Sequence, residues 1–535
     1  MLSILITLFV LSVVNFGNGI AIGSMLKIKD QNFVWTSFLG MMGMTLLQTV
    51  IALVSPLDLV VEIVMATSAL IGLLWFFLVQ KRVGFKIKLD FWFYFFLLTI
   101  VFAASFSPYL FDHYGYYVPT VSYLKELGFV KGISNLDLLL GQTSFWHIYQ
   151  AGFSHFADPF LKINSYLLLL FLVYIYERKQ YFLLIFFPVF LLFVQQPSPD
   201  LPILVMALIV INELLNKKES SMILYLSVFA FCIKSIVFWL PLFVVLHTFS
   251  QKKLTLKSII PFIVFGTLLV FKNIWLFGFP MFPVSFIDFN LPWKPSQEVL
   301  TYSSQMGMMK SYDMKYSYQQ VSGFDFSDQV WHWFTIGFKS VLNIGILISL
   351  WIIAAFTLKQ KKKFYYLLLI CLILKTVLII CFSAQYRFFI DVYVVALFLL
   401  FKNTSKEKSV FIAAFLSIFI AIIFTVPGFV QRFNIGKQMS GFCWSQFYKP
   451  KVIGQMKVIP TYQIGNFHFN ASKDPVDKVH FPALNLYDLK LYDYYGIFPQ
   501  YLGKDPKDGI FQRKLKADEK IQLKKIISKT EKLKP

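Results

Sequence analysis

Long runs of apolar residues, separated by short polar segments, dominate the chain. They cover residues 2–23, 33–54, 58–80, 91–105, 163–176, 181–195, 200–214, 221–233, 236–249, 258–277, 336–358, 364–382, 389–401 and 409–427. A helix needs about 20 apolar residues to cross the roughly 30 Å hydrocarbon core of a membrane. The pattern predicts an all-α polytopic membrane protein with about fourteen (12–14) transmembrane helices, and the shorter runs predict half-helices or paired hairpins inside the bundle.

The polar segments divide the chain into two regions. The helical region, residues 1–427, contains two long polar connections at 106–162 and 278–335. Residues 428–535 are rich in turns, aromatic residues and charges, and their length suits a small domain. We therefore expect a transmembrane bundle followed by a small C-terminal α+β domain.

Basic residues cluster in the short connections between apolar runs. They are Lys27, Lys29, Lys81, Arg82, Lys86, Lys88, Arg178, Lys179, Lys217, Lys218, Lys252, Lys253, Lys257, Lys359, Lys361, Lys362, Lys363, Lys402, Lys406 and Lys408. If every apolar run crosses the membrane, all of them fall on one side, which the positive-inside rule makes cytoplasmic. The long polar connections and both termini are then extracytoplasmic. Because Arg is scarce beside Lys, as in AT-rich bacterial genomes, we expect a bacterial inner membrane.

The composition narrows the class of protein and its partners. Of the residues, 57% are hydrophobic and 15% are charged, whereas soluble proteins carry about 25% charged residues. The net charge of +22 is explained by basic turns that face anionic lipid. An ordinary soluble enzyme is therefore excluded, and we expect membrane lipid rather than nucleic acid as a partner.

The first polar connection contains an acid close to the point where a helix leaves the bilayer. Asp112 and His113 follow the run 91–105, and an aromatic-rich segment that ends at Gly128 is expected to form a helix at the membrane surface. A carboxylate in this position is well placed to take a proton from a hydroxyl group as a general base. Alternatively, Asp112 is an interfacial acid among Tyr and Trp anchors.

An arginine lies in a short outward turn between two apolar runs. Arg387 in this turn is able to bind a phosphate through bidentate hydrogen bonds, or to anchor the turn at the membrane boundary. Asp391 lies four residues further on and is a candidate partner for Arg387 on one helical face. The sequence leaves both roles of Arg387 open.

Three further charges interrupt apolar segments, where charge is costly. Asp200 follows a Pro-rich break, Lys234 lies within residues 221–249, and Lys272 lies near the outer end of 258–277. We predict Lys234 and Lys272 as phosphate contacts, and Asp200 as a second acid that orients an acceptor or binds a cation. Alternatively, each residue lies at a hairpin tip in the outer interface.

Aromatic and amide side chains near these charges are candidates for contact with a sugar or an acceptor, because flat rings beside hydrogen-bonding groups suit carbohydrates. The candidates are Tyr116, Asn135, Gln142, Trp146 and Tyr386. The same residue types also form interfacial belts. The His and Cys residues show no spacing typical of metal ligands, so a divalent cation is left open.

Several motifs resemble a known family. The Asp112-His113-Tyr114 turn and the Gln385-Tyr386-Arg387-Phe388-Phe389 turn resemble those of the GT-C superfamily of integral-membrane glycosyltransferases. An uncharacterised group of GT-C-like bacterial membrane proteins, common in Bacteroidota, has motifs similar to Gly132-Ile133-Ser134-Asn135-Leu136, Ser198-Pro199-Asp200-Leu201-Pro202 and Gly465-Asn466. His113 stands where many GT-C enzymes have a second acid.

The resemblance implies an outward-facing glycosyltransferase with a GT-C-like bundle. Asp112, with His113 beside it, is then the catalytic base or a metal ligand, and the donor is a sugar on a polyprenyl phosphate. Arg387, helped by Lys272 or Lys234, is expected to stabilise the departing phosphate. Transfer to an extracytoplasmic glycan, lipid or protein acceptor inverts the anomeric centre.

Two other functions stay open at this level. An O-antigen polymerase or ligase also joins lipid-linked glycans outside the membrane, but it relies on arginines rather than on an acidic base. A non-enzymatic assembly or transport component would use the outer loops and the C-terminal domain to bind a partner. Variants of Asp112 and Arg387 distinguish these alternatives.

Overall fold

The structure is a computed structural model, and it describes residues 1–27, 32–80, 88–216, 221–253, 255–433, 436–452, 459–474 and 480–533. Some residues of the predicted basic turns lie outside this part of the chain, namely Lys29, Lys81, Arg82, Lys86, Lys217 and Lys218.

Each predicted apolar run coincides with a helix. These helices are α1 Leu2–Met25, α2 Phe33–Ala52, α3 Leu59–Trp75, α4 Phe91–Ala104, α7 Ile163–Arg178, α8 Phe187–Leu191, α9 Asp200–Leu215, α10 Ser221–Ile233, α11 Trp239–Ser250, α12 Leu256–Phe277, α16 Ser340–Gln360, α17 Lys363–Phe382, α18 Ile390–Phe401 and α19 Lys406–Thr425. Polar residues fix several of their starts, because the side chains of Asn32, Asp58, Asp90 and Ser405 accept hydrogen bonds from backbone N–H groups of the first turn.

In the part of the chain that the structure describes, seven helices are long and apolar enough to cross a membrane. These spans are Leu2–Met25, Phe33–Ala52, Leu59–Leu78, Ile259–Phe277, Ser340–Gln360, Lys363–Phe382 and Lys406–Thr425. Shorter apolar helices, such as α4 and α10, accompany them. The predicted helical bundle with long and short apolar helices is confirmed, and the number of crossings stays a prediction.

Burial separates the centre of the bundle from its periphery. Residues of α9 are buried continuously from Leu201 to Glu213, so this helix is buried on every side. By contrast, only 28% of the apolar stretch of α16 is buried inside the protein, and residues such as Trp351 expose large apolar side chains. A helix that is apolar all round but exposed needs a cover of lipid or protein.

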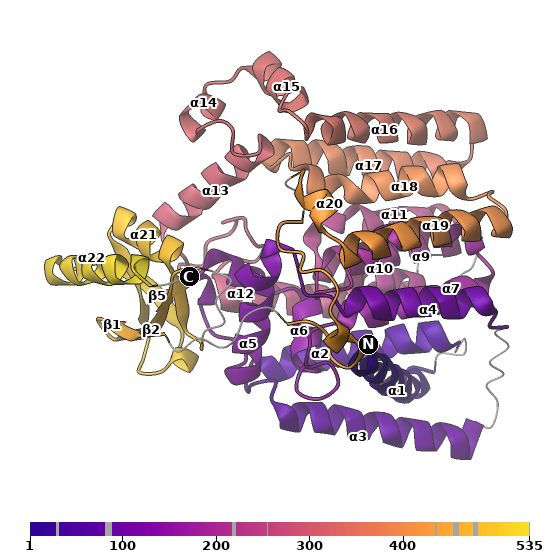
Figure 1. Ribbon diagram of the computed structural model, residues 1–535, viewed down its shortest axis with the longest axis horizontal. Coiled ribbons are helices and arrows are strands. Elements are labelled where there is room, and N and C mark those ends of the chain that lie inside the picture. Colours follow the sequence, from indigo (N-terminus) through magenta and orange to yellow (C-terminus); the bar gives the residue numbers. More distant parts are fainter. Residues whose placement is uncertain are drawn as a thin grey trace.

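The turns of the bundle lie at two opposite ends (Figure 1). Helices α3, α16 and α18 end, and α4, α17 and α19 begin, at one end, which we call the basic end because the Lys-rich turns lie there. The other end, the polar-loop end, carries the C-terminal strands and three helices of the second long connection. These are α13 Gln297–Ser311, α14 Tyr318–Ser322 and α15 Phe326–Phe334.

Two further helices belong to the first long connection, α5 Val118–Glu126 and α6 Phe145–Ala151. A short π-helical turn, His113–Tyr117, leads from α4 into α5, so a helix does precede Gly128, and its position at a membrane surface stays a prediction. After α19, the short helix α20 Gly428–Gln431 is followed by a segment that covers the ends of α1 and α4 at the polar-loop end, because Ser3 N–H donates to Tyr448 and Lys451 N–H to Ser105. The N-terminus therefore lies at the polar-loop end.

The expected small strand-containing unit forms the C-terminal part. Its strands are β1 Thr461–Ile464, β2 Phe467–Ser472, β3 Ala483–Asn485, β4 Ile497–Tyr501 and β5 Ile510–Lys514, and its helices are α21 Leu486–Tyr495 and α22 Ala517–Glu531. β1 and β2 form an antiparallel hairpin, β3 pairs parallel to β2, and β4 pairs antiparallel to β5.

Residues 132–136 form a docking seat for this C-terminal unit. Gly132 has a φ of +63°, and a Cβ atom there would lie 2.3 Å from the carbonyl oxygen of Ile510. The amide nitrogen of Asn135 donates to the carbonyls of Gly132, Trp293 and Ile510 at 2.7–3.0 Å. Asn135 in turn accepts a hydrogen bond from Tyr492 at its backbone carbonyl. The close approach of the Ile510 backbone requires a residue without a side chain at position 132. The three carbonyls around position 135 require an amide donor such as that of Asn135.

Candidate functional site

The structure brings Asp112 and Arg387 together at the polar-loop end. Asp112 immediately precedes the π-helical turn His113–Tyr117, and Arg387 lies in a 3₁₀ turn, Tyr386–Phe389, between α17 and α18. Although 275 residues separate them, Nη1 of Arg387 donates to Oδ2 of Asp112 at 3.2 Å. The two side chains are 44% and 38% exposed, so the pair is open to solvent.

A second ion pair joins Lys234 and Asp200, which the sequence singled out separately. Asp200 begins α9, where the helix dipole favours an acid. Lys234 lies between α10 and the 3₁₀ turn Ser235–Val237. The hydroxyl of Ser198 donates to Oδ2 of Asp200 at 3.3 Å, so the Pro-rich break before α9 holds this carboxylate in place.

The ring of Phe388 connects the two ion pairs. The guanidinium carbon of Arg387 lies 5.2 Å from the ring centre, and Nζ of Lys234 lies 5.7 Å from it. Both distances are within the range of cation–π attraction. Asp112, Arg387, Asp200 and Lys234 therefore form one charge cluster around Phe388, built from four separate segments of the chain.

Aromatic side chains lie against this cluster. Burial and the nearby charge of Asp112 raise the pKa of Tyr116, and Asp200 acts in the same direction. Tyr116 therefore keeps its proton and is available as a hydrogen-bond donor. The His147 ring lies 4.8 Å from the ring of Tyr117 and 5.9 Å from that of Tyr116, and burial lowers its pKa to about 3. His147 is thus a neutral imidazole.

The buried side chain of His113 contacts an aromatic residue of the same turn. Its ring packs edge-on against Tyr114, at 4.8 Å between ring centres, and it is buried. The side chain therefore supports the turn that carries Asp112.

Several residues predicted at the site lie in other contacts. Lys272 is buried, and its Nζ donates to the carbonyls of Gln142 and Thr143 at 2.8 Å each. Trp146 is fully buried, and its indole N–H donates to Asn164 at 2.7 Å. These contacts tie α12 and α7 to the first long connection. Asn135 belongs to the docking seat.

Tyr386 lies next to the cluster in sequence but contacts another lysine. Nζ of Lys339 lies 5.3 Å from the centre of the Tyr386 ring, and Lys339 also forms an ion pair with Asp313. This contact fixes the second long connection to the turn that carries Arg387.

The expected pairing of Asp391 with Arg387 is wrong. Asp391 instead pairs with Lys375 at 2.5 Å and accepts a hydrogen bond from the indole N–H of Trp239 at 2.6 Å. Arg387 lies in the 3₁₀ turn before α18, so the two residues do not share one α-helical face. Lys375 interrupts the apolar run 364–382, and this charge was a signal that could have identified the buried pair.

A lysine that sequence reasoning missed lies near the cluster. Burial and the charge of Arg387 lower the pKa of Lys310 in α13, while Asp112 and Asp137 oppose this shift. Lys310 lies in the polar connection 278–335, where a charged residue is ordinary, so the sequence did not indicate a role for it. Among the described residues, no three His, Cys, Asp or Glu side chains gather as ligands for a metal ion.

Comparison with known proteins assigns the chain to one family. No curated protein and no solved structure matches the chain significantly. A family model described as a domain of unknown function (DUF8201) matches residues 1–394, which include all four charged residues of the cluster. Because this match covers well over half of the 535 residues, the chain belongs to the DUF8201 family.

Proposed function

We propose that the protein is a membrane glycosyltransferase that moves a sugar from a polyprenyl-phosphate donor to an acceptor outside the bacterial inner membrane. The main support is the open ion pair of Asp112 and Arg387 at the polar-loop end of an apolar bundle. A donor with its lipid chain among the helices would present its phosphate at this level. A carboxylate and two cations would then lie around the bond that has to break.

Substrate binding changes the partner of Arg387 in this mechanism. In the free protein the guanidinium is bound to Asp112. An anionic phosphate competes for the guanidinium, because bidentate arginine–phosphate bonds are strong. Phosphate binding therefore releases Asp112, and the carboxylate becomes free to accept a proton from the hydroxyl of the acceptor.

The transfer itself is a single displacement. Asp112 takes the hydroxyl proton, the acceptor oxygen bonds to the anomeric carbon, and the bond from that carbon to the phosphate oxygen breaks with its electron pair on the phosphate. Arg387 and Lys234 stabilise the departing phosphate, and attack from the opposite face inverts the anomeric carbon. Asp200 holds Lys234 in position through its ion pair.

Binding of the phosphate is tested with undecaprenyl phosphate and with undecaprenol, which lacks the phosphate. Protein in nanodiscs is expected to bind the phosphate lipid more tightly. Arg387→Gln should weaken this binding by about 10- to 100-fold, because hydrogen bonds to charged groups are lost. Lys294→Gln is the matched control, since Lys294 forms another partly exposed ion pair in an outer loop. Equal binding of both lipids contradicts the proposal.

Catalysis is tested with a panel of synthetic undecaprenyl-phosphate hexoses and a mixed pool of acceptors. Asp112→Asn is expected to retain donor binding but to lower transfer by about 10²- to 10⁴-fold, the usual contribution of a general base. Asp288→Asn removes a comparably exposed paired acid and serves as the control. If transfer depends on Arg387 but not on Asp112, an arginine-based polymerase or ligase is favoured instead.

A further inference from the structure

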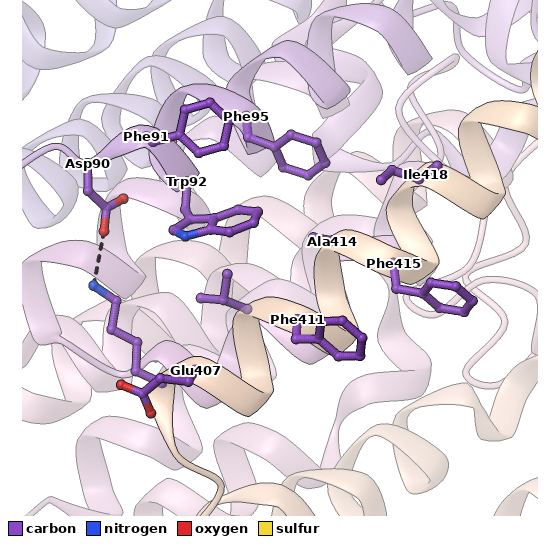
Figure 2. Close-up of a pocket in the computed structure, with 11 residues that line it drawn as sticks. Asp90, Phe91, Trp92, Phe95, Glu407, Phe411, Ala414, Phe415 and Ile418 are labelled. Atoms are coloured by element: carbon purple, nitrogen blue, oxygen red, sulfur yellow. Dashed lines mark hydrogen bonds and ion pairs between the residues drawn. The ribbon is translucent and has the colours of Figure 1, made fainter.

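A groove of about 740 Å³ runs between α4 and α19, starting at the basic end. Figure 2 shows Trp92 and Phe95 of α4 opposite Phe411 and Ala414 of α19. Charged side chains line only its mouth, where Asp90 and Lys406 pair at 3.0 Å and Glu407 lies beside them. The groove is therefore charged at its mouth and apolar along the rest of its length.

The length of the groove along α19 is close to the thickness of the hydrocarbon layer of one membrane leaflet. Its lining extends along α19 from Lys406 to Ile418, which at about 1.5 Å per residue corresponds to roughly 18 Å. Half of the hydrocarbon core is about 15 Å. Lys406, Val410, Ala414 and Ile418 are spaced four residues apart, so they lie on one face of the helix. Ala414 is the smallest of these side chains and leaves room for an acyl chain.

The mouth presents charges of both signs. Asp90 caps α4 by accepting from the backbone N–H of Phe93, and it accepts the hydroxyl hydrogen of Tyr176 at 2.6 Å as well as pairing with Lys406. Its position is thus fixed. The ammonium group of Lys406 has three N–H donors and its side chain is 40% exposed, so it can also bind a phosphate. The exposed carboxylate of Glu407 would repel a purely anionic headgroup but attract an ammonium group.

We propose that this groove binds one zwitterionic phospholipid with a primary ammonium group, such as phosphatidylethanolamine. One acyl chain lies against the apolar lining, the phosphate binds Lys406, and the ammonium group binds Glu407. The occupant is a lipid of the leaflet at the basic end. It is separate from the charge cluster, which lies at the polar-loop end, and its binding does not depend on glycosyl transfer.

The test is native mass spectrometry of the full chain, titrated with phosphatidylethanolamine, phosphatidylcholine and phosphatidylglycerol of the same acyl chains. One phosphatidylethanolamine molecule is expected to bind about tenfold more tightly than either of the others. Lys406→Gln should weaken its binding about tenfold. Glu407→Gln should remove the preference over phosphatidylglycerol. Lys408→Gln is the control, since Lys408 lies on the same helix end but outside the lining.

Two further measurements distinguish lipid binding by the apolar groove from binding by its charged mouth. Ala414→Phe fills the groove and should weaken binding of all three lipids, provided that the unfolding temperature of the variant is unchanged. Free phosphoethanolamine, which has no acyl chains, should bind far more weakly than the lipid. Equal or tighter binding of phosphatidylglycerol overturns the proposal, and so does unchanged binding by Lys406→Gln, a surface substitution that leaves the apolar packing intact.

Discussion

Lys375 and Asp391 form a buried ion pair that contacts the turn carrying Arg387 and Phe388. Nζ of Lys375 pairs with Asp391 and also donates to the backbone carbonyl of Phe388, the residue whose ring lies between Arg387 and Lys234. Removal of one partner leaves an uncompensated buried charge, which typically costs about 3–5 kcal/mol. We expect Asp391→Asn to lower the free energy of unfolding by this amount, measured by thermal unfolding in detergent.

A surface pair provides the control for this residue-scale prediction. Asp313 pairs with Lys339 at the polar-loop end, where both side chains are at least one-third exposed. Exposed pairs contribute little to stability, so Asp313→Asn should change the unfolding temperature only slightly. Equal effects of the two substitutions would mean that Asp391 is not held in an unhydrated interior.

At the scale of elements, the docking seat depends on the glycine at position 132. Gly132→Ala would place a Cβ atom 2.3 Å from the Ile510 carbonyl oxygen at a positive φ, so either the seat or β5 has to move. We expect faster hydrogen exchange in β4 and β5 while the helical bundle stays protected. Gly266→Ala in α12 is the matched control, because a Cβ atom there meets no neighbour within 4 Å. Unchanged exchange in Gly132→Ala would contradict the docking role.

At the scale of the whole molecule, we expect two acids to make docking of the C-terminal unit dependent on pH. Burial raises the pKa of Asp137, beside the docking seat, to about 6, against the opposing effects of the hydrogen bond from the Leu139 N–H and the charge of Lys310. Burial and the charge of Asp137 raise the pKa of Asp488 in α21 well above its ordinary value. The docked state therefore binds protons more readily than the undocked state. Its stability should fall as the pH rises from about 4 through 6, where Asp137 titrates, and the raised pKa of Asp488 extends this fall to higher pH.

Hydrogen exchange of β4 and β5 at pH 5 and pH 7.5, corrected for the intrinsic rate, measures this effect. The unit should be better protected at pH 5. Asp137→Asn combined with Asp488→Asn should make protection nearly independent of pH, because neither side chain then titrates. Better protection of the wild-type chain at pH 7.5 would reverse the sign and contradict the assignment of both acids.

The arrangement of helices follows closely from the sequence, because apolar runs and polar caps are local signals. The runs at 33–54 and 364–382 became α2 and α17 within a few residues. The sequence also identified Asp112, Arg387, Asp200 and Lys234 individually, since a charge that interrupts or borders an apolar run carries a desolvation cost. The docking-seat motif was recognised, although its contact with β5 was not.

Sequence alone therefore determined the helical bundle, the two-region organisation and the set of costly charges. Only the tertiary structure decided which of these charges meet: Arg387 pairs with Asp112 across 275 residues rather than with Asp391 four residues away. It also decided that Lys272 and Trp146 belong to interior contacts. The physical reason is that secondary structure depends on neighbours in the chain, whereas the partner of a buried charge is set by helix packing, which brings distant segments together.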